Sequence, residues 1–228
     1  MRAAAAGDHR GEDTALAHHG VLFLDELPHF KPAVLNNLRE PIETGSATLS
    51  RVGYRVSYPC RFQLVAAMNP CPAGRSCKAH SCRCNPEQVR RYQSRISGPL
   101  IDRIDLQVLV QEVPQAELLA SDHPAIDLEN LRQHIAEAHQ KQIERQGVSN
   151  GALSPRQVTQ MIREAGVSSS LLETLAKKEF SARSLHKIWK VARTVADLAN
   201  ENSIEDQHVL QALGFRTLDW EGGLNVRP

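Results

Sequence analysis

The chain has 228 residues, enough for one large domain or two small ones. A formal net charge of +1 argues against a protein that coats nucleic acid over its whole surface, although a local basic patch is compatible with it. No apolar run approaches the roughly 20 residues that a membrane span needs, and the first residues lack the apolar segment of a signal peptide. We therefore expect a cytoplasmic protein without a membrane partner, in which the five cysteines are thiols or metal ligands rather than disulfides.

The first part of the chain, residues 20 to about 113, has the short apolar runs and Gly/Pro punctuation of an α/β fold. The predicted elements are, in chain order, a buried strand at 20–24, a helix at 31–43, a β-hairpin of 47–51 and 55–58 with Gly53 at its turn, a buried strand at 62–68, a helix at 86–96 capped by Asn85, and a third apolar strand at 104–110.

The second part is nearly all helical in pattern. Helices are predicted at 128–146, from Ser154-Pro155 onward, at 169–180, at 182–200 and at 205–213. These patterns divide the chain into an α/β domain at 1–115 and an all-α domain at 116–228.

Two carboxylates, Asp25 and Glu26, follow directly on the first apolar strand. In open α/β sheets, ligands bind at the carboxyl ends of the strands. Hydrolysis of a nucleoside triphosphate uses such a pair, because one carboxylate holds hydrated Mg²⁺ and the other orients the attacking water. The alternative is that the two acids only mark the solvated end of a strand.

Two further polar residues stand at strand ends. Asn69 follows the strand at 62–68 and could bind a γ-phosphate or the attacking water, or it could simply form a turn before Pro70. Arg103 precedes the strand predicted at 104–110 and could equally form an ordinary salt bridge with Asp102 or Asp105.

Together these segments resemble the magnesium-chelatase-like AAA+ ATPases of the ComM/YifB group. The resemblance extends over about 11–218, and the segments that carry it are 16–28 (LAHHGVLFLDELP), 38–43 (LREPIE), 66–70 (AAMNP), 100–105 (LIDRID) and 190–198 (KVARTVADL). It implies part of an AAA+ P-loop NTPase core, a parallel sheet with a β-hairpin insert, followed by an all-α lid domain.

The resemblance also implies roles for matching residues. Asp25 and Glu26 correspond to the Walker B motif, Asn69 to sensor 1, Arg103 to the arginine finger and Arg183 to sensor 2. ATP and Mg²⁺ would be bound by Asp25, Glu26, Asn69 and Arg183, and the subunits would form a ring, a hexamer in this family. A guanidinium suits both arginine roles because it stays charged and forks onto phosphate oxygens.

In related ring ATPases, the hairpin before sensor 1 faces the central pore and can contact DNA. Here the matching residues 46–58 carry Arg51, Tyr54 and Arg55, a basic and aromatic mixture compatible with backbone contacts and base stacking. A solvated hairpin stabilised by its own cross-strand pairs is an equal alternative.

The sequence departs from the family at one motif, since Gly-x-x-x-x-Gly-Lys-Ser/Thr, the Walker A loop, occurs nowhere in it. We therefore expect a truncated or split gene product that does not turn over ATP alone. The leading hypothesis is part of an ATPase that remodels DNA by branch migration in recombination or natural transformation. The alternatives are a metal-insertion ATPase subunit and an inactive fragment acting as a binding module.

Four cysteines fall within fourteen residues, at Cys71, Cys77, Cys82 and Cys84. Four thiols in one short loop can surround a tetrahedral Zn²⁺ ion. Their spacing is unlike the paired C-x-x-C of common zinc ribbons, which favours the alternative of a surface loop with reduced thiols.

Overall fold

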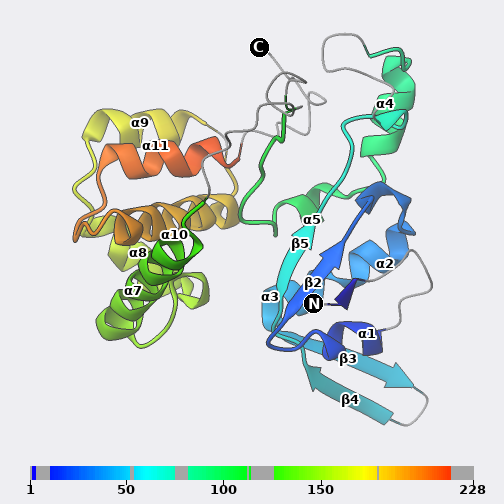
Figure 1. Cartoon of the computed structure of the whole chain (residues 1–228), viewed down its shortest axis with the longest axis horizontal. Coiled ribbons are helices and arrows are strands. Elements are labelled where there is room, and N and C mark those ends of the chain that lie inside the picture. The colour runs from blue at the N-terminus through cyan, green and yellow to red at the C-terminus, as the bar shows by residue number, and fades with distance from the viewer. Residues whose placement is uncertain are drawn as a thin grey trace. The chain divides into compact units, whose positions relative to one another are not determined.

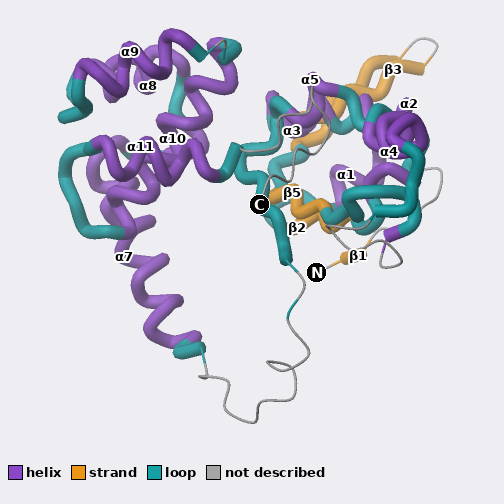
Figure 2. Tube along the Cα trace, turned by 90° about the horizontal axis from the view of Figure 1, so that it is seen from above, coloured by secondary structure: helices purple, strands orange, loops and turns teal. Residues whose placement is uncertain are grey.

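The computed structural model describes residues 2–3, 11–51, 54–74, 82–111, 113, 126–178 and 180–216. These residues divide into two compact units, one within 1–104 and the other within 105–217 (Figure 1). The strands lie in the first unit and the second is built from helices (Figure 2). Because 114–125 are outside the described residues, the domain boundary at 115/116 stays a prediction.

The first unit is organised around a parallel sheet in the order β1-β2-β5. Strand β2 (Val21–Leu24) lies between β1 (Arg2–Ala3) and β5 (Gln63–Ala66), with Leu22 opposite Leu64 and Leu24 opposite Ala66. Both strands predicted on either side of the hairpin are present, and β2 has Leu22 and Leu24 buried as expected. The burial expected for β5 is wrong: this strand is shorter than predicted, Gln63 and Val65 are exposed, and it is the edge of the described sheet.

Short helices complete the first unit. They are α1 (Gly11–Leu16), the 3₁₀ helix η1 (Leu27–His29), α2 (Pro32–Asn37), α3 (Arg39–Thr44), α4 (Pro86–Gln93) and α5 (Gly98–Ile101). The core joins Leu22 and Leu24 of β2 to Leu35, Ile96 and Leu100. Leu35 belongs to α2, Leu100 to α5 and Ile96 to the turn between α4 and α5, so these segments pack against β2.

The helix predicted at 31–43 is two helices that meet at Leu38. Pro41 explains the break, because proline has no N–H to donate to the carbonyl of Asn37 and its ring clashes with that carbonyl. The prediction of helical structure in this segment is confirmed, but the prediction of one continuous helix is wrong.

The hairpin prediction is confirmed. Strands β3 (Ser46–Arg51) and β4 (Tyr54–Pro59) pair antiparallel from Ser46↔Pro59 to Arg51↔Tyr54. The predicted turn residue Gly53 lies outside the described residues.

The strand predicted at 104–110 is wrong. The segment has no regular secondary structure, and Leu106, Val108, Leu109 and Val110 are all exposed, the last by 87%. An apolar run becomes a strand only when a neighbouring strand accepts and donates its backbone hydrogen bonds. Among the described residues no strand pairs with this segment, and the backbone N–H of Gln107 instead donates to the carbonyl of Phe215 (2.8 Å).

The second unit is all helical over its described residues, as predicted. Its elements are α7 (Leu128–Gln146), the 3₁₀ helix η3 (Asn150–Ala152), α8 (Pro155–Arg163), α9 (Ser169–Lys177), α10 (Ala182–Leu198) and α11 (Asp206–Gly214). Helix α10 supplies the centre of the core through Ile188, Trp189 and Ala192, which pack with Val158 of α8 and Val209 of α11. Among the described residues, no helix has the length and apolar character that a membrane span requires.

Candidate active site

The carboxyl edge of the sheet brings Asp25, Glu26 and Asn69 to one place. Pairing between the β2 and β5 chains continues past the strand ends, because Ala67 N–H donates to Leu24 O (2.9 Å) and Leu27 N–H donates to Ala67 O (3.0 Å). Asp25 and Glu26 therefore lie beside Ala67, and Asn69 follows two residues later. All three side chains are exposed at this edge.

Glu26 has a left-handed backbone, with φ 51° and ψ 47°. This conformation costs a non-glycine residue roughly 1 kcal/mol and persists where surrounding contacts hold it. Here the Glu26 N–H donates to Asp25 Oδ1 (2.8 Å) and the Glu26 carbonyl accepts from His29 N–H (2.8 Å), while Leu27 and Pro28 are buried. The turn fixes where the two carboxylates leave the sheet.

Tyr92 of α4 is a buried partner of this site that the sequence did not reveal. Burial raises the pKa of its hydroxyl, with negative charge at Cys71 and Glu26 adding to the rise, whereas a hydrogen bond from the backbone of Asn69 and the charge of Arg95 oppose it. Tyr92 therefore lies near Asn69 and Glu26. A tyrosine in a chain with few aromatic residues was the available signal, but helical spacing alone does not say what it contacts.

The chain after Asn69 folds back against that side chain. Gly74 has φ 53°, and a Cβ on it would approach Asn69 Nδ2 to 3.1 Å, so the turn packs closely on the amide. The carbonyl of Pro70 accepts a hydrogen bond from Gln93 Nε2 of α4 (3.0 Å). Asn69 is thus held between its own turn and α4.

Arg103 is buried within the first unit rather than extended from it. Its Nη2 and Nε contact Glu43 Oε2 at 2.5 and 3.1 Å, and its Nη1 donates to the carbonyl of Pro99 (2.6 Å). This salt bridge is with Glu43, a partner that was not considered from the sequence. The role of arginine finger stays a prediction, and it would require Arg103 to exchange Glu43 for a phosphate.

Arg183 stands in the first turn of α10, in the second unit, and is exposed. The structure therefore brings Asp25, Glu26 and Asn69 together within one unit, places Arg103 elsewhere in it, and leaves a sensor 2 role for Arg183 as a prediction.

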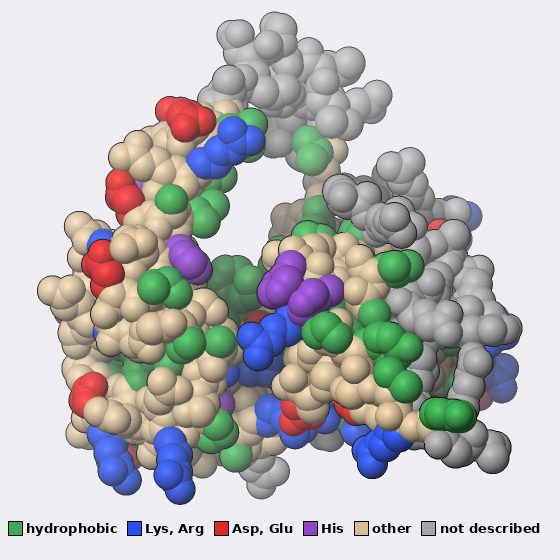
Figure 3. Space-filling model, turned by 90° about the horizontal axis from the view of Figure 1, so that it is seen from below, with side chains coloured by type: hydrophobic (Ala, Val, Ile, Leu, Met, Phe, Trp, Pro, Cys, Tyr) green, Lys and Arg blue, Asp and Glu red, His purple; other side chains and the backbone are tan. Residues whose placement is uncertain are grey.

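The hairpin presents the residues predicted to contact nucleic acid on β3 and β4. Tyr54 is 79% exposed and Arg55 is also exposed. Arg51 is described by its backbone alone, which pairs with Tyr54 across the hairpin. On the face seen in Figure 3, the described Lys and Arg side chains occur in several separate groups rather than in one continuous basic surface.

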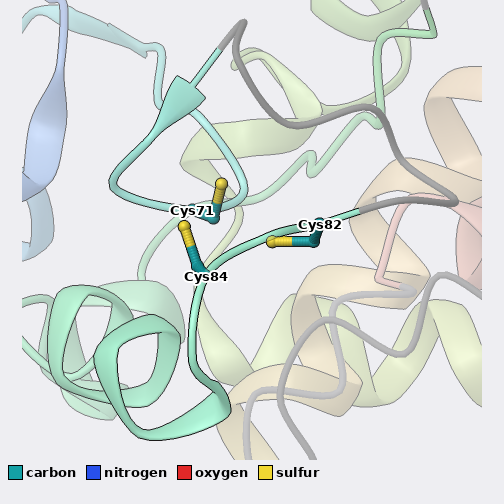
Figure 4. A group of neighbouring side chains, drawn as sticks. All are labelled: Cys71, Cys82 and Cys84. Atoms are coloured by element: carbon teal, nitrogen blue, oxygen red, sulfur yellow. The ribbon is translucent and has the colours of Figure 1, made fainter.

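Three of the four predicted cysteine ligands converge. Cys71 lies in the turn after Asn69, and Cys82 and Cys84 lie on the segment that leads into α4; their Sγ atoms are all within 4.8 Å of one another (Figure 4). Cys77 lies outside the described residues. Beside this cluster is a cavity of about 530 Å³ whose wall includes Cys84, Tyr92, Arg91 and Arg95.

The donor set at the sheet edge fits hydrated Mg²⁺, which prefers one or two carboxylates together with water. Asp25 would hold the ion through its water, Glu26 would orient the attacking water, and Asn69 would donate to an anionic oxygen. The 228 residues contain no Walker A sequence.

Comparison with known proteins identifies the family of this chain. The family model for magnesium chelatase subunit ChlI matches residues 4–118, and that for the ChlI C-terminal region matches 127–216. YifB of Escherichia coli is 40% identical over 208 residues, which are 91% of this chain and 41% of YifB. Competence protein ComM of Haemophilus influenzae is 39% identical over 207 residues, 90% of this chain and 40% of ComM, so the chain spans about two fifths of these relatives. The chain belongs to the magnesium chelatase family, in the group that contains ComM and YifB.

Proposed function

We propose that this chain supplies the hydrolysis side of an AAA+ ATP site. Asp25 holds hydrated Mg²⁺, Glu26 orients and polarises the attacking water, and Asn69 hydrogen-bonds the γ-phosphate or that water. The observation that supports the proposal is the backbone pairing that continues past β2 and β5, because it puts Asp25, Glu26 and Asn69 at the carboxyl edge of adjacent parallel strands. The arginine roles of Arg103 and Arg183 and a ring of subunits belong to the same proposal.

The substrate that we propose for the motor is DNA, remodelled during recombination or natural transformation. Support comes from the name of one relative, a competence protein, and from the exposed Tyr54 and Arg55 of the hairpin. A tyrosine can stack on bases of any sequence and an arginine can bind phosphates. Such contacts suit a motor that acts on many sequences.

ATP hydrolysis by a reconstituted protein tests the proposal. The part of E. coli YifB that precedes its matched region would be joined to this chain, and phosphate release would be measured with and without branched DNA. We expect the chain alone to be inactive, the fusion to hydrolyse ATP, and DNA to increase the rate. A folded fusion that binds ATP but does not hydrolyse it would overturn the proposal.

DNA binding is tested with the hairpin itself. We expect Tyr54→Ala, which removes a stacking ring, to weaken binding of the fusion to single-stranded DNA by roughly 1–3 kcal/mol. Arg55→Ala should weaken the same binding by less. Fluorescence anisotropy at several salt concentrations measures this, and Arg163→Ala, an exposed arginine of α8, is the control. Equal affinity in all variants would remove the hairpin from the DNA contact.

A metal-insertion ATPase subunit is the second candidate, because the matching family models describe a magnesium chelatase subunit. The two functions differ in what stimulates hydrolysis. An ATPase rate that does not respond to single-stranded or branched DNA would favour metal insertion.

A further inference from the structure

We propose that Cys71, Cys82 and Cys84 bind a Zn²⁺ ion that ties the turn behind Asn69 to the start of α4. Their three Sγ atoms lie within 4.8 Å of one another, from two segments separated by ten residues of sequence. A tetrahedral zinc–thiolate site with bonds of about 2.3 Å has sulfur atoms about 3.8 Å apart. The thiols therefore need only a small closure to reach the geometry of the ion.

Local structure holds two of the ligands in place before an ion arrives. Cys71 is 3% exposed, and its carbonyl accepts a hydrogen bond from Gly74 N–H (3.1 Å). Cys84 directly precedes Asn85, whose side chain caps α4 by accepting from Glu87 N–H (2.9 Å) while Gln88 Oε1 accepts from the backbone of Asn85 (3.2 Å). A site preorganised in this way loses less conformational entropy on binding.

The charge and softness of the donors favour zinc. Thiolates select soft or borderline ions such as Zn²⁺ over Mg²⁺ and Ca²⁺. Three thiolates around a divalent ion carry a net charge of about −1, and Arg91 and Arg95 line the cavity that Cys84 also borders. The fourth position of the tetrahedron takes one further donor or a water molecule.

The ion would act on Asn69 through the chain. Cys71 follows Asn69 by two residues, and Gly74 packs against the Asn69 amide. Gln93 of α4 donates a hydrogen bond to the carbonyl of Pro70, the residue between Asn69 and Cys71. Fixing the cysteines to one ion therefore locks both supports of Asn69. This consequence for hydrolysis rests on the proposed function, whereas the zinc site does not.

Metal content and Co²⁺ substitution test the site in the full chain. Elemental mass spectrometry of the purified protein should find about one zinc ion per chain. Protein loaded with Co²⁺ in place of zinc should show thiolate-to-metal charge-transfer bands and the d–d bands of a tetrahedral site. We expect Cys71→Ser, Cys82→Ser and Cys84→Ser each to lower zinc affinity at least about tenfold, and the buried Cys60→Ala to leave it unchanged.

A second measurement on the unaltered chain covers variants that fail to fold. Cysteine alkylation can be mapped by peptide mass spectrometry. Added Zn²⁺ should protect Cys71, Cys82 and Cys84 together from alkylation, and a chelator should make all three reactive again. Protein without zinc that shows no Co²⁺ thiolate bands, or protection that does not respond to Zn²⁺, would overturn the site whatever the ATPase result. Loss of ATPase with zinc binding intact would instead count against the proposed function alone.

Discussion

Arg103 and Glu43 form an ion pair that joins α3 to the turn after α5. The arginine is 8% exposed and also donates to the carbonyl of Pro99. The pairing spans sixty residues of sequence, so local pattern could suggest a salt bridge for Arg103 but not its partner. The same holds for Tyr92, which reaches the site through tertiary packing.

Neutralising Glu43 should destabilise the first unit. Glu43→Gln removes the carboxylate charge that buried Arg103 contacts at 2.5 Å, and because Glu43 is itself 41% exposed we expect a moderate loss of about 1–3 kcal/mol. Urea unfolding followed by circular dichroism measures it. Glu129→Gln, which breaks the exposed 3.8 Å pair with Arg132, is the control and should change stability by less than about 0.5 kcal/mol. Equal effects of the two changes would contradict the structural role of Glu43.

Asp206 should make the second unit sensitive to acid. Its Oδ2 accepts from Ser168 Oγ (2.5 Å) and its Oδ1 from Ser168 N–H (2.8 Å), and these hydrogen bonds lower its pKa below the usual 3.8. A depressed folded pKa contributes stability that is present above pH 3.8 and is lost as the pH falls through the folded value.

We therefore expect Asp206→Asn to be less stable than the unaltered chain at pH 6, with the difference shrinking as the pH falls below about 4. Thermal unfolding across this range checks the prediction. A stability difference that is constant with pH would show that the ionised carboxylate is not what stabilises the link between α9 and α11.

At the scale of elements, local chemistry predicted the helices of the second unit well. Helix α7 begins after the capping residue Asp127 and ends at Gly147 with φ 75°, and α8 begins with a Ser154-Pro155 cap. These signals lie within a few residues of each helix end. The segment 104–110 failed because strand formation depends on a distant neighbour, which an apolar pattern does not report.

A buried network joins α7, η3 and α10 around Asp197. Its carboxylate accepts from Arg145 (2.6 and 3.0 Å), from Arg193 Nε (3.1 Å) and from Asn150 Nδ2 (2.8 Å). Burial lowers the pKa of Arg193, and the charge of Asp197 opposes that effect. The network therefore keeps a buried guanidinium charged.

Removing the charge of Asp197 should unfold the second unit more readily. We expect Asp197→Asn to cost about 3–5 kcal/mol, because the buried guanidinium of Arg193 then loses the carboxylate with which it forms a salt bridge. Urea denaturation measures the loss, with Glu173→Gln on the exposed face of α9 as the matched control. A loss below about 1 kcal/mol would mean that water or relaxation replaces the carboxylate.

At the scale of the whole molecule, each unit has a hydrophobic core of its own, one around Leu35 and the other around Trp189. We therefore expect two unfolding transitions, one for each unit. Leu35→Ala should lower the free energy of unfolding of the first unit by about 2–5 kcal/mol, and Trp189→Ala should lower that of the second unit by about 3–5 kcal/mol. Calorimetry resolves the two, and both variants shifting a single shared transition would contradict separate cores.

The order of motifs along the chain predicted the family and the sheet edge, because Asp25 and Glu26 follow directly on β2 and Asn69 comes shortly after the end of β5. The neighbours that hold these residues, Tyr92 and Gly74, come from other segments and needed the fold. The role proposed for Asp25, Glu26 and Asn69 at this edge is ATP hydrolysis.

The most direct measurement of that role compares ATP binding with ATP hydrolysis in the YifB fusion carrying Glu26→Gln. If Glu26 activates the attacking water, kcat should fall at least about 100-fold while ATP affinity changes little, and Glu87→Gln, an exposed glutamate of α4, should leave both unchanged. Hydrolysis by Glu26→Gln at the unaltered rate would contradict the assignment of the sheet edge as the hydrolysis site.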